Sequence, residues 1–256
     1  MDVQNRLKKL FTEQIYALDI AAPLPSFDGE RDADTVRRIM EATGAWVAGI
    51  RTGGLISGWV RREDLASGRC QTHMQVFRPE QMMSDDGGLH RALEILAEEK
   101  VCFLGTLGQV HAFVTAEDIQ KPAARMWLFG MITILEMFFS RAIEARYPDE
   151  AWVGRVTPAR LAKARQLLEE RRRRGERQVQ LLDCLQLAEK ALVLVKDDAF
   201  LAETRFDSRR AAKMAIKRLD LLRNRLAHSQ ELVLEDWPMV IQLVRGTERI
   251  LWRERE

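Results

Sequence analysis

The first half of the chain carries the same pattern twice, and this repeat limits the possible fold more than any other feature. Residues 36–65 align with residues 90–119 without a gap, at an offset of 54. Each copy begins with a helix-periodic segment, continues with two apolar runs around a glycine-containing turn, and ends at the start of a helix. Two copies predict a pair of similar α+β units related by pseudo-two-fold symmetry, not a solenoid.

The end of each copy carries side chains that suit a nucleotide. In the second copy an apolar strand ends at Thr115 and Asp118 follows three residues later, whereas the first copy has Arg61 and Asp64 at these positions. A hydroxyl and backbone N–H groups at a helix N-terminus suit a phosphate, and a carboxylate can accept both ribose hydroxyls. Arg61 can clamp a phosphate as a charged fork. The structural alternative is that Thr115 caps its helix and Asp118 completes a capping box.

This pattern, from about residue 8 to residue 121, resembles the CBS domain, and two such domains in tandem resemble a Bateman module. The resemblance implies an adenine nucleotide as ligand: AMP, ADP, ATP or S-adenosylmethionine. It also implies that Thr115, Asp118, Asp64 and Arg61 contact the phosphate and ribose. Because Arg61 stands where Thr is usual, the resemblance implies one good half-site, and hence a single nucleotide or none.

Lys121-Pro122 marks a predicted domain boundary, with residues 1–121 on one side and residues 122–256 on the other. The most apolar run after it, Met126 to Phe139, contains Glu136 and is too short to span a bilayer, so we expect a buried helix and no membrane contact. Short connections between successive helices favour antiparallel neighbours and hence an all-α bundle. The predicted helices are 122–146, 158–174, 177–196, 208–230 and 237–253.

The segment 208–230 shows the strongest helical periodicity of the second half. Asn224 and His228 lie four residues apart on the side roughly opposite its apolar stripe, and Arg223 lies on the flank of the stripe. Met214 and Leu221 share the face of Asn224 and His228, which suggests that another subunit covers this face. The stripe consists of Ala212, Ala215, Leu219, Leu222 and Leu226.

The run from Arg223 to His228, Arg-Asn-Arg-Leu-Ala-His, resembles the R-x4-H signature of the HEPN superfamily. The resemblance implies an all-α bundle that dimerises through this helix, and many members are metal-independent ribonucleases while others are inactive. It implies that His228 acts as general acid or base and that Arg223 stabilises a phosphorane-like transition state. Asn224 would hold the histidine or bind a phosphate oxygen.

Charge is distributed unevenly between the two halves. Residues 1–121 have 14 Lys and Arg against 18 Asp and Glu, and residues 122–256 have 26 against 20. The net charges of −4 and +6 are compatible with RNA as partner of the second half, but far from those of a dedicated nucleic-acid binder, and we do not expect DNA. The basic run Arg171 to Arg174 is a solvated helix end or a phosphate contact.

We therefore predict an α+β N-terminal CBS-pair domain followed by an all-α, HEPN-like C-terminal bundle. The predicted function is an adenine-nucleotide-regulated, metal-independent endoribonuclease that acts as a homodimer and leaves 2′,3′-cyclic phosphate ends. Three cysteines without metal-ligand spacing fit reduced thiols and a cytoplasmic location. The alternative is a non-catalytic, adenine-nucleotide-binding interaction protein in which Arg223 and His228 stabilise a helical dimer interface.

Overall fold

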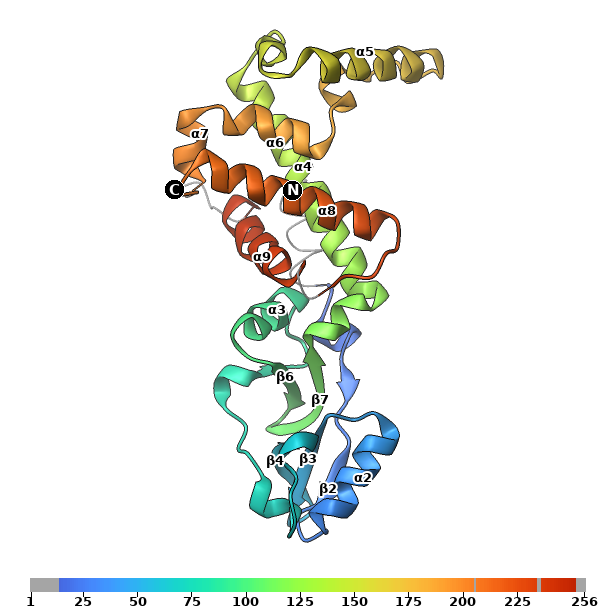
Figure 1. Ribbon diagram of the computed structural model, residues 1–256, viewed down its shortest axis with the longest axis vertical. Helices are drawn as coiled ribbons and strands as arrows, with labels where there is room; N and C mark the ends of the chain where they lie inside the picture. The colour runs from blue at the N-terminus through green and yellow to red at the C-terminus, as the bar shows by residue number, and fades with distance from the viewer. Residues whose placement is uncertain (1–13, 205, 234–235, 252–256) are drawn as a thin grey trace. The chain divides into compact units, whose positions relative to one another are not determined.

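The computed structural model describes residues 14–204, 206–233 and 236–251 and shows a mixed α/β protein with N-terminal sheets and C-terminal helices (Figure 1). The chain divides into two compact units, one ending at Arg125 and the other beginning at Met126. The boundary predicted after Lys121 lies a few residues earlier, because helix α4 begins at Pro122 and its first turn belongs to the first unit.

The first copy of the repeat folds in the predicted order of helix, strand, hairpin turn and strand, and a strand that was not predicted, β2, precedes it. Strand β2 (Ser26–Asp28) leads into helix α2 (Ala33–Thr43), followed by the hairpin of β3 (Val47–Thr52) and β4 (Leu55–Arg61) and the 3-10 turn η2 (Arg62–Asp64). These strands form a three-stranded sheet of order β2-β3-β4, with β2 parallel and β4 antiparallel to β3.

The second copy repeats this order and gains one strand. A short strand, β1 (Ala22–Pro23), pairs antiparallel with β7 and gives a four-stranded sheet of order β1-β7-β6-β5. The elements of the copy are β5 (Met82–Ser84), α3 (Leu89–Glu98), β6 (Val101–Thr106), β7 (Gln109–Thr115) and the 3-10 turn η5 (Ala116–Gln120). Three further 3-10 turns, η1 (Ala17–Asp19), η3 (Cys70–His73) and η4 (Pro79–Gln81), lie outside the two copies.

Both hairpins close with two residues in the left-handed conformation. Gly53 and Gly54 have φ angles of 62° and 86°, and Leu107 and Gly108 have φ angles of 51° and 79°. Two-residue loops with positive φ match the twist of the flanking strands, which explains the predicted glycine turns. Leu107 is 99% exposed, so the second hairpin accepts a strained non-glycine residue without burying it.

The register of each hairpin shifts at an equivalent place. The irregularity falls between Ile50 and Arg51 in the first copy and between Leu104 and Gly105 in the second. A Cβ atom added to Gly105 would lie 2.5 Å from the carbonyl oxygen of Gln109, so this bulge needs a glycine in the second copy. The two copies therefore share a backbone irregularity as well as an order of elements.

The two sheets share one apolar core. The Trp59 ring of the first copy lies 5.1 Å from the Phe103 ring of the second, centroid to centroid, and Phe77 meets Phe103 edge-on at 4.8 Å. Neither copy could bury this surface alone, so the pair folds as one body. The shared cluster contains Leu24, Val47, Trp59, Val101, Phe103, Val110 and Phe113.

The second unit is made of helices. Four of the five predicted helices are confirmed: α4 (Pro122–Arg146), α5 (Pro158–Arg173), α8 (Arg209–Ala227) and α9 (Trp237–Leu251). The bounds of α4 are those predicted, and the ends of α5 and α8 differ from the predicted ones by at most three residues. Helix α9 begins as predicted, and its predicted end at residue 253 lies outside the described residues. The predicted helix 177–196 is only partly correct, since its α-helical part is α6 (Leu187–Val195), preceded by the 3-10 turn η7 (Leu181–Cys184). The helix α7 (Asp198–Glu203) and the 3-10 turn η6 (Ala151–Arg155) were not predicted.

Side-chain caps divide the segment that was predicted as one helix. The carboxylate of Asp183 accepts the backbone N–H of Gln180 at 2.9 Å, and that of Glu189 accepts the N–H of Gln186 at 2.9 Å. Each pair is a helix-start signal, and two such signals in close succession give two short elements. Asp197 starts α7 differently, as an N-cap residue whose side chain accepts the backbone N–H of Ala199 at 2.9 Å.

Helix α4 packs into the protein as a core helix. By length and composition alone it could also cross a membrane. Half of its most apolar 18-residue window is buried inside the protein. It also carries Glu136, which forms an ion pair of 2.9 Å with Lys190 of α6, a residue only 5% exposed. A buried lysine needs a counter-charge, and Glu136 supplies it to Lys190.

Candidate functional site

Helix α8 presents the R-x4-H residues. It begins after Ser208, whose side chain accepts the backbone N–H of Ala211 at 3.1 Å. The predicted stripe is correct except at one position, because Ile216 is buried where Ala215 was expected and Ala215 is half-buried. The buried face consists of Ala212, Ile216, Leu219, Leu222 and Leu226.

The two arginines of the motif have different partners. Arg225 forms an ion pair with Asp236, a residue 8% exposed that also accepts the backbone N–H of Val233 at 2.9 Å. Arg223 donates from Nη1 to the Oδ1 atom of Asn224 at 3.0 Å. Arg225 therefore holds the chain that follows α8. Among the described residues, the guanidinium of the half-buried Arg223 is bound only to a neutral amide, so it keeps further donors for a ligand.

His228 closes the helix and is exposed. Its backbone N–H donates to the carbonyl oxygen of Asn224 at 3.0 Å, which fixes the predicted four-residue stacking of the two residues. Ser229 follows in the left-handed conformation with φ of 53°, and the N–H of Gln230 returns to the carbonyl of Arg225 at 2.9 Å. The imidazole is thus carried on a well-defined helix end and is open to solvent.

The face of α8 that carries Asn224 also carries exposed apolar side chains. Met214 and Leu221 are each 50% exposed, and no segment of the described chain covers them further. Exposed apolar residues that share a helix face with a candidate site are typical of a surface that meets a partner. The expectation that another subunit covers this face remains a prediction.

The candidate nucleotide residues of the second copy form an internal cap. Asp118 accepts the backbone N–H of Thr115 at 2.7 Å and its hydroxyl at 3.0 Å, and forms an ion pair with Lys121 at 2.8 Å. Lys121 also donates to the carbonyl oxygen of Ile20 at 2.5 Å. The capping-box arrangement is therefore present, and a ribose would have to replace at least the Lys121 contact.

The first copy uses its own pair in a similar way. Arg61 donates to Asp64 from Nε at 2.8 Å and from Nη2 at 3.2 Å, and Gln75 donates to the same carboxylate at 2.9 Å. A third contact joins Arg61 to Glu63 at 3.1 Å. The guanidinium group of Arg61 is thus bound to carboxylates of the same copy.

The helix starts expected at both half-sites are 3-10 turns. The turn after Arg61 has three residues and the turn after Thr115 has five. Such short turns lack the aligned peptide dipoles of a longer α-helix. The α-helix starts expected after Arg61 and Thr115 are therefore absent, and phosphate binding at these turns stays a prediction.

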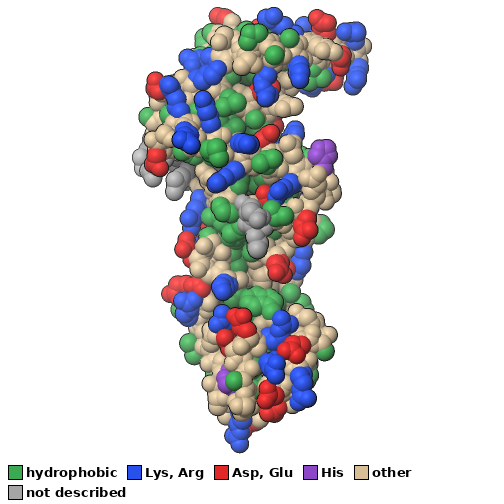
Figure 2. Space-filling model, in the orientation of Figure 1, with side chains coloured by type: hydrophobic (Ala, Val, Ile, Leu, Met, Phe, Trp, Pro, Cys, Tyr) green, Lys and Arg blue, Asp and Glu red, His purple; other side chains and the backbone are tan. Residues whose placement is uncertain are grey.

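The basic run lies at the end of an exposed helix. Of the residues of α5, only Ala164 is buried, and Figure 2 shows Lys and Arg side chains on this face of the second unit. Arg171 is bound to Glu176 at 2.6 Å, and this contact raises the pKa of its guanidinium. The side chains of this segment that are cationic and make no hydrogen bond or ion pair with a described residue are those of Lys163, Arg165, Arg172, Arg174 and Arg177.

Comparisons with known proteins do not assign the chain to a family. No protein-family model matches the sequence, and no curated protein matches it. Among solved structures, the chain is similar to the crystal structure of protein MJ1004 from Methanocaldococcus jannaschii, with 12% identity and a TM-score of 0.40 over 92% of this chain and 100% of that one.

Proposed function

We propose that the protein is an adenine-nucleotide-regulated, metal-independent endoribonuclease that acts as a homodimer. The observation that carries the proposal is the end of α8. There an exposed imidazole follows the Arg223–Asn224 pair on one helix, while Arg225 is tied to Asp236. An acid–base group and a guanidinium are the two groups that cleavage by the 2′-hydroxyl of RNA requires from a protein.

The chemistry balances without an added reactant. His228 of one protomer would take the proton of the 2′-hydroxyl, whose oxygen attacks the adjacent phosphorus. His228 of the partner subunit, protonated, would give its proton to the leaving 5′-oxygen as the P–O bond breaks. Arg223 would offset the charge on the phosphoryl oxygens, so a symmetric pair of chains supplies both acid and base.

The test of the activity is cleavage of mixed RNAs by the purified full chain in the presence of EDTA. Products should end in a 2′,3′-cyclic phosphate or its hydrolysed form, because the attacking oxygen comes from the substrate. An activity that appears only with Mg²⁺, or products with a 3′-hydroxyl, would contradict the mechanism.

Nucleotide binding should depend on the second copy. Calorimetry with AMP, ADP, ATP and S-adenosylmethionine should detect at least one ligand, and Asp118→Ala should weaken it because the ribose loses its acceptor. Lys121→Ala should retain or strengthen binding, since it frees a carboxylate oxygen of Asp118. Glu80→Ala, which removes an exposed carboxylate outside both half-sites, is the matched control and should leave the affinity unchanged.

Loss of the Asp118 cap costs about 1 kcal/mol of stability, so thermal unfolding of each variant should accompany the titrations. Absence of heat with all four ligands would make residues 1–121 a structural scaffold. Equal affinity in the wild type and in Asp118→Ala would place the ligand elsewhere.

The dimer should form through the exposed apolar face of α8. Light scattering at micromolar concentration should give twice the chain mass of 29.5 kDa, and Leu221→Asp should return the protein to 29.5 kDa because a carboxylate would be buried in the interface. Leu167→Asp on α5, where the leucine is 42% exposed, is the matched control and should remain dimeric. A wild-type mass of 29.5 kDa would remove the composite site.

The alternative function is a non-catalytic, nucleotide-responsive interaction protein. It is favoured by the apolar side chains of Met214 and Leu221, because a dimer that covers them could also cover His228. In that case His228→Ala would weaken the dimer and leave no cleavage to lose. Measurement of dimer affinity and RNA cleavage on the same variant separates the two functions.

The three cysteines support a reducing compartment as part of the proposal. Cys70, Cys102 and Cys184 are free and buried. Burial raises the pKa of the Cys102 thiol to about 12, which keeps it protonated and unreactive. We propose a cytoplasmic location on this basis.

A further inference from the structure

The positive charge of the second half of the chain is concentrated in one segment. Residues 157–177, which cover α5 and the turn after it, have eight Lys and Arg against three Glu, a net charge of +5. Residues 122–256 together have a net charge of only +6. Ala164 is the one buried residue of α5, and Figure 1 shows this helix extending beyond the other helices of its unit. The segment therefore presents a cationic surface to solvent.

The order of charges along α5 is not explained by the stability of the helix. The helix dipole favours acidic residues in the first turn and basic residues in the last turn. In α5 the first turn has Arg160 and no acidic residue, and Lys163 follows in the next turn. The acidic residues of the helix, Glu169 and Glu170, lie toward its C-terminal end. A negatively charged ligand would offset this unfavourable order of charges.

Most cations of the segment are available to such a ligand. Arg160 forms an ion pair with Glu189, Arg171 with Glu176 and Arg173 with Glu169. The side chains of the other five, the free cations named above, make no hydrogen bond or ion pair with a residue that the structure describes. The surface therefore keeps about as many uncompensated charges as the net charge of the segment suggests.

A pocket of about 480 Å³ opens beside these cations, between one face of α5 and the segment around η7 and the start of α6. Its volume lies within the range of about 300–1,000 Å³ that is usual for sites of small organic ligands. The lining combines the free cation of Lys163 with the apolar side chain of Leu167, the hydroxyl of Thr157 and the amide of Gln186. A nucleotide needs these three kinds of group: an apolar surface for the base, hydrogen-bonding groups for its edge and a cation for its phosphate.

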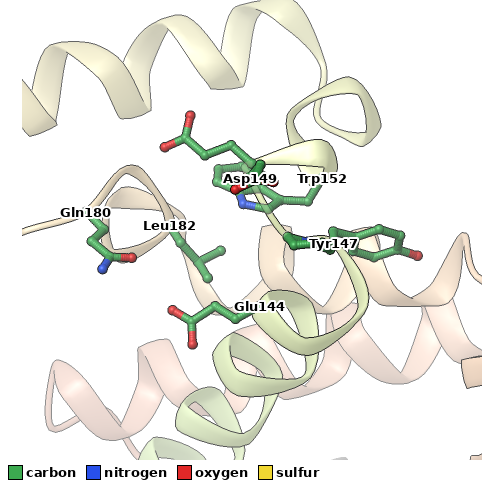
Figure 3. Close-up of a pocket in the computed structure, with 8 residues that line it drawn as sticks. Glu144, Tyr147, Asp149, Trp152, Gln180 and Leu182 are labelled. Carbon is green, nitrogen blue, oxygen red and sulfur yellow. The ribbon is translucent and has the colours of Figure 1, made fainter.

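A smaller pocket in the same unit does not suit an anion. It has a volume of about 220 Å³ and lies at the end of α4, where Glu144, Asp149 and Glu150 line it together with Trp152 (Figure 3). Three carboxylates would repel a phosphate. Of these two pockets, the one beside α5 is therefore the one that fits a nucleotide.

The free cations continue from the pocket to the end of α5. Lys163 and Arg174 are eleven residues apart, which places them on the same face of the helix and about 16 Å apart along its axis. Arg172 and Arg177 lie at the same end. A chain of phosphates that begins at the pocket can therefore meet further cations along the helix.

We propose that residues 157–177 form an exosite for single-stranded RNA, in which the pocket holds one unpaired base and the free cations bind the neighbouring phosphates. The inference rests on the proposed function, because it names where the RNA of that function is held outside the active centre. Single strands are favoured over duplexes, since a base inside a duplex is not available to a pocket. RNA is favoured over an acidic protein, since a carboxylate side chain would leave the pocket unfilled.

The exosite and the end of α8 lie on different sides of α6. Helix α6 packs against α8, whereas α5 packs against η7, which precedes α6. Figure 1 shows α6 between α5 and α8. A long RNA can reach both places, whereas a dinucleotide bound at His228 cannot also reach Lys163.

The experiment is RNA binding by the full chain, with His228→Ala as background so that the RNA stays intact. The probe is a labelled single strand of about twelve nucleotides, and binding is measured by fluorescence anisotropy. Removal of three free cations in Lys163→Gln/Arg172→Gln/Arg174→Gln should lower the slope of log K against log salt by about 2, because each phosphate contact of a single strand adds about 0.7. In about 0.1 M salt this corresponds to about a hundredfold loss of affinity.

The matched control removes three exposed cations from the first unit. Arg31→Gln/Arg38→Gln/Lys100→Gln lowers the net charge by the same amount and should keep the affinity and the salt slope of the parent chain. Circular dichroism of both triple variants checks that each is folded.

A second comparison tests the pocket separately from the phosphate contacts. The variant Leu167→Ala should bind the RNA about fourfold more weakly, which corresponds to about one methylene group removed from contact with the base. It should bind an abasic oligomer of the same length as tightly as the parent chain does, because that oligomer has no base to place in the pocket.

Cleavage by the chain with His228 intact separates this inference from the proposed function. The triple variant of α5 should raise the KM for a long RNA and leave cleavage of a dinucleotide unchanged, since contacts far from the reacting bond act on binding. If the ribonuclease function fails, cleavage is absent from every variant while the differences in affinity remain. The exosite is overturned if the triple variant of α5 binds RNA like its control, or if a duplex or a glutamate peptide of equal charge binds as tightly as the single strand.

Discussion

Replacement of His228 by alanine is expected to lower the rate of RNA cleavage by about 10²–10⁴-fold, because the variant loses the proton-transfer group of both protomers. The fold should survive, since the side chain is exposed at the end of α8 and contributes nothing to its buried face. The measurement is single-turnover cleavage of a labelled RNA in EDTA, with circular dichroism of each variant.

The control variants test the neighbours of His228. Arg223→Ala should cost a similar factor through lost charge stabilisation, and Arg223→Lys should recover only part, since a point charge replaces a fork. Gln230→Ala, an exposed position just after the helix, should cleave at the wild-type rate. Cleavage that is unchanged in His228→Ala would show that α8 does not carry the active site.

Replacement of Glu136 by leucine is expected to destabilise the second unit by about 3–5 kcal/mol, because it leaves the ammonium of Lys190 buried without a counter-charge. Lys190 is only 5% exposed, whereas the side chain of Glu136 is 30% exposed. The two single variants should therefore differ. Lys190→Met should cost less, about 1 kcal/mol, because Glu136 can turn toward water.

The double variant Glu136→Leu/Lys190→Met separates charge from packing. It should regain most of the stability that Glu136→Leu loses, since an apolar pair of similar volume replaces the ion pair. Urea unfolding followed by circular dichroism measures these free energies. A Glu136→Leu variant as stable as the wild type would mean that Lys190 reaches water in solution.

Much of the architecture could be predicted because periodicity and glycine placement report directly on the backbone. The repeat offset located both hairpins, and Gly53-Gly54 and Gly108 mark their turns. The limits of the helices were harder to predict, because local capping outweighs periodicity between residues 177 and 196. There Asp183 and Glu189 turn back to the backbone and divide a continuous apolar pattern.

The candidate sites could be predicted less completely than the fold. Spacing placed Asn224 and His228 on one face, yet it could not show that Arg225 is bound to Asp236 while Arg223 is not. A pocket lined by Trp152 was not predicted at all, although most of its lining residues fall between Glu144 and Trp152. The signal available was the run of carboxylates after Tyr147-Pro148, which has no cation of its own within the loop.

The matching bulges in the two hairpins show what each half contributes to the pair. The bend between Ile50 and Arg51 and that between Leu104 and Gly105 fall at equivalent positions, so both sheets turn at the same point of the repeat. A single half would expose the apolar surface that both sheets share. Each half is therefore complete only opposite its counterpart, and the two sheets are expected to unfold together.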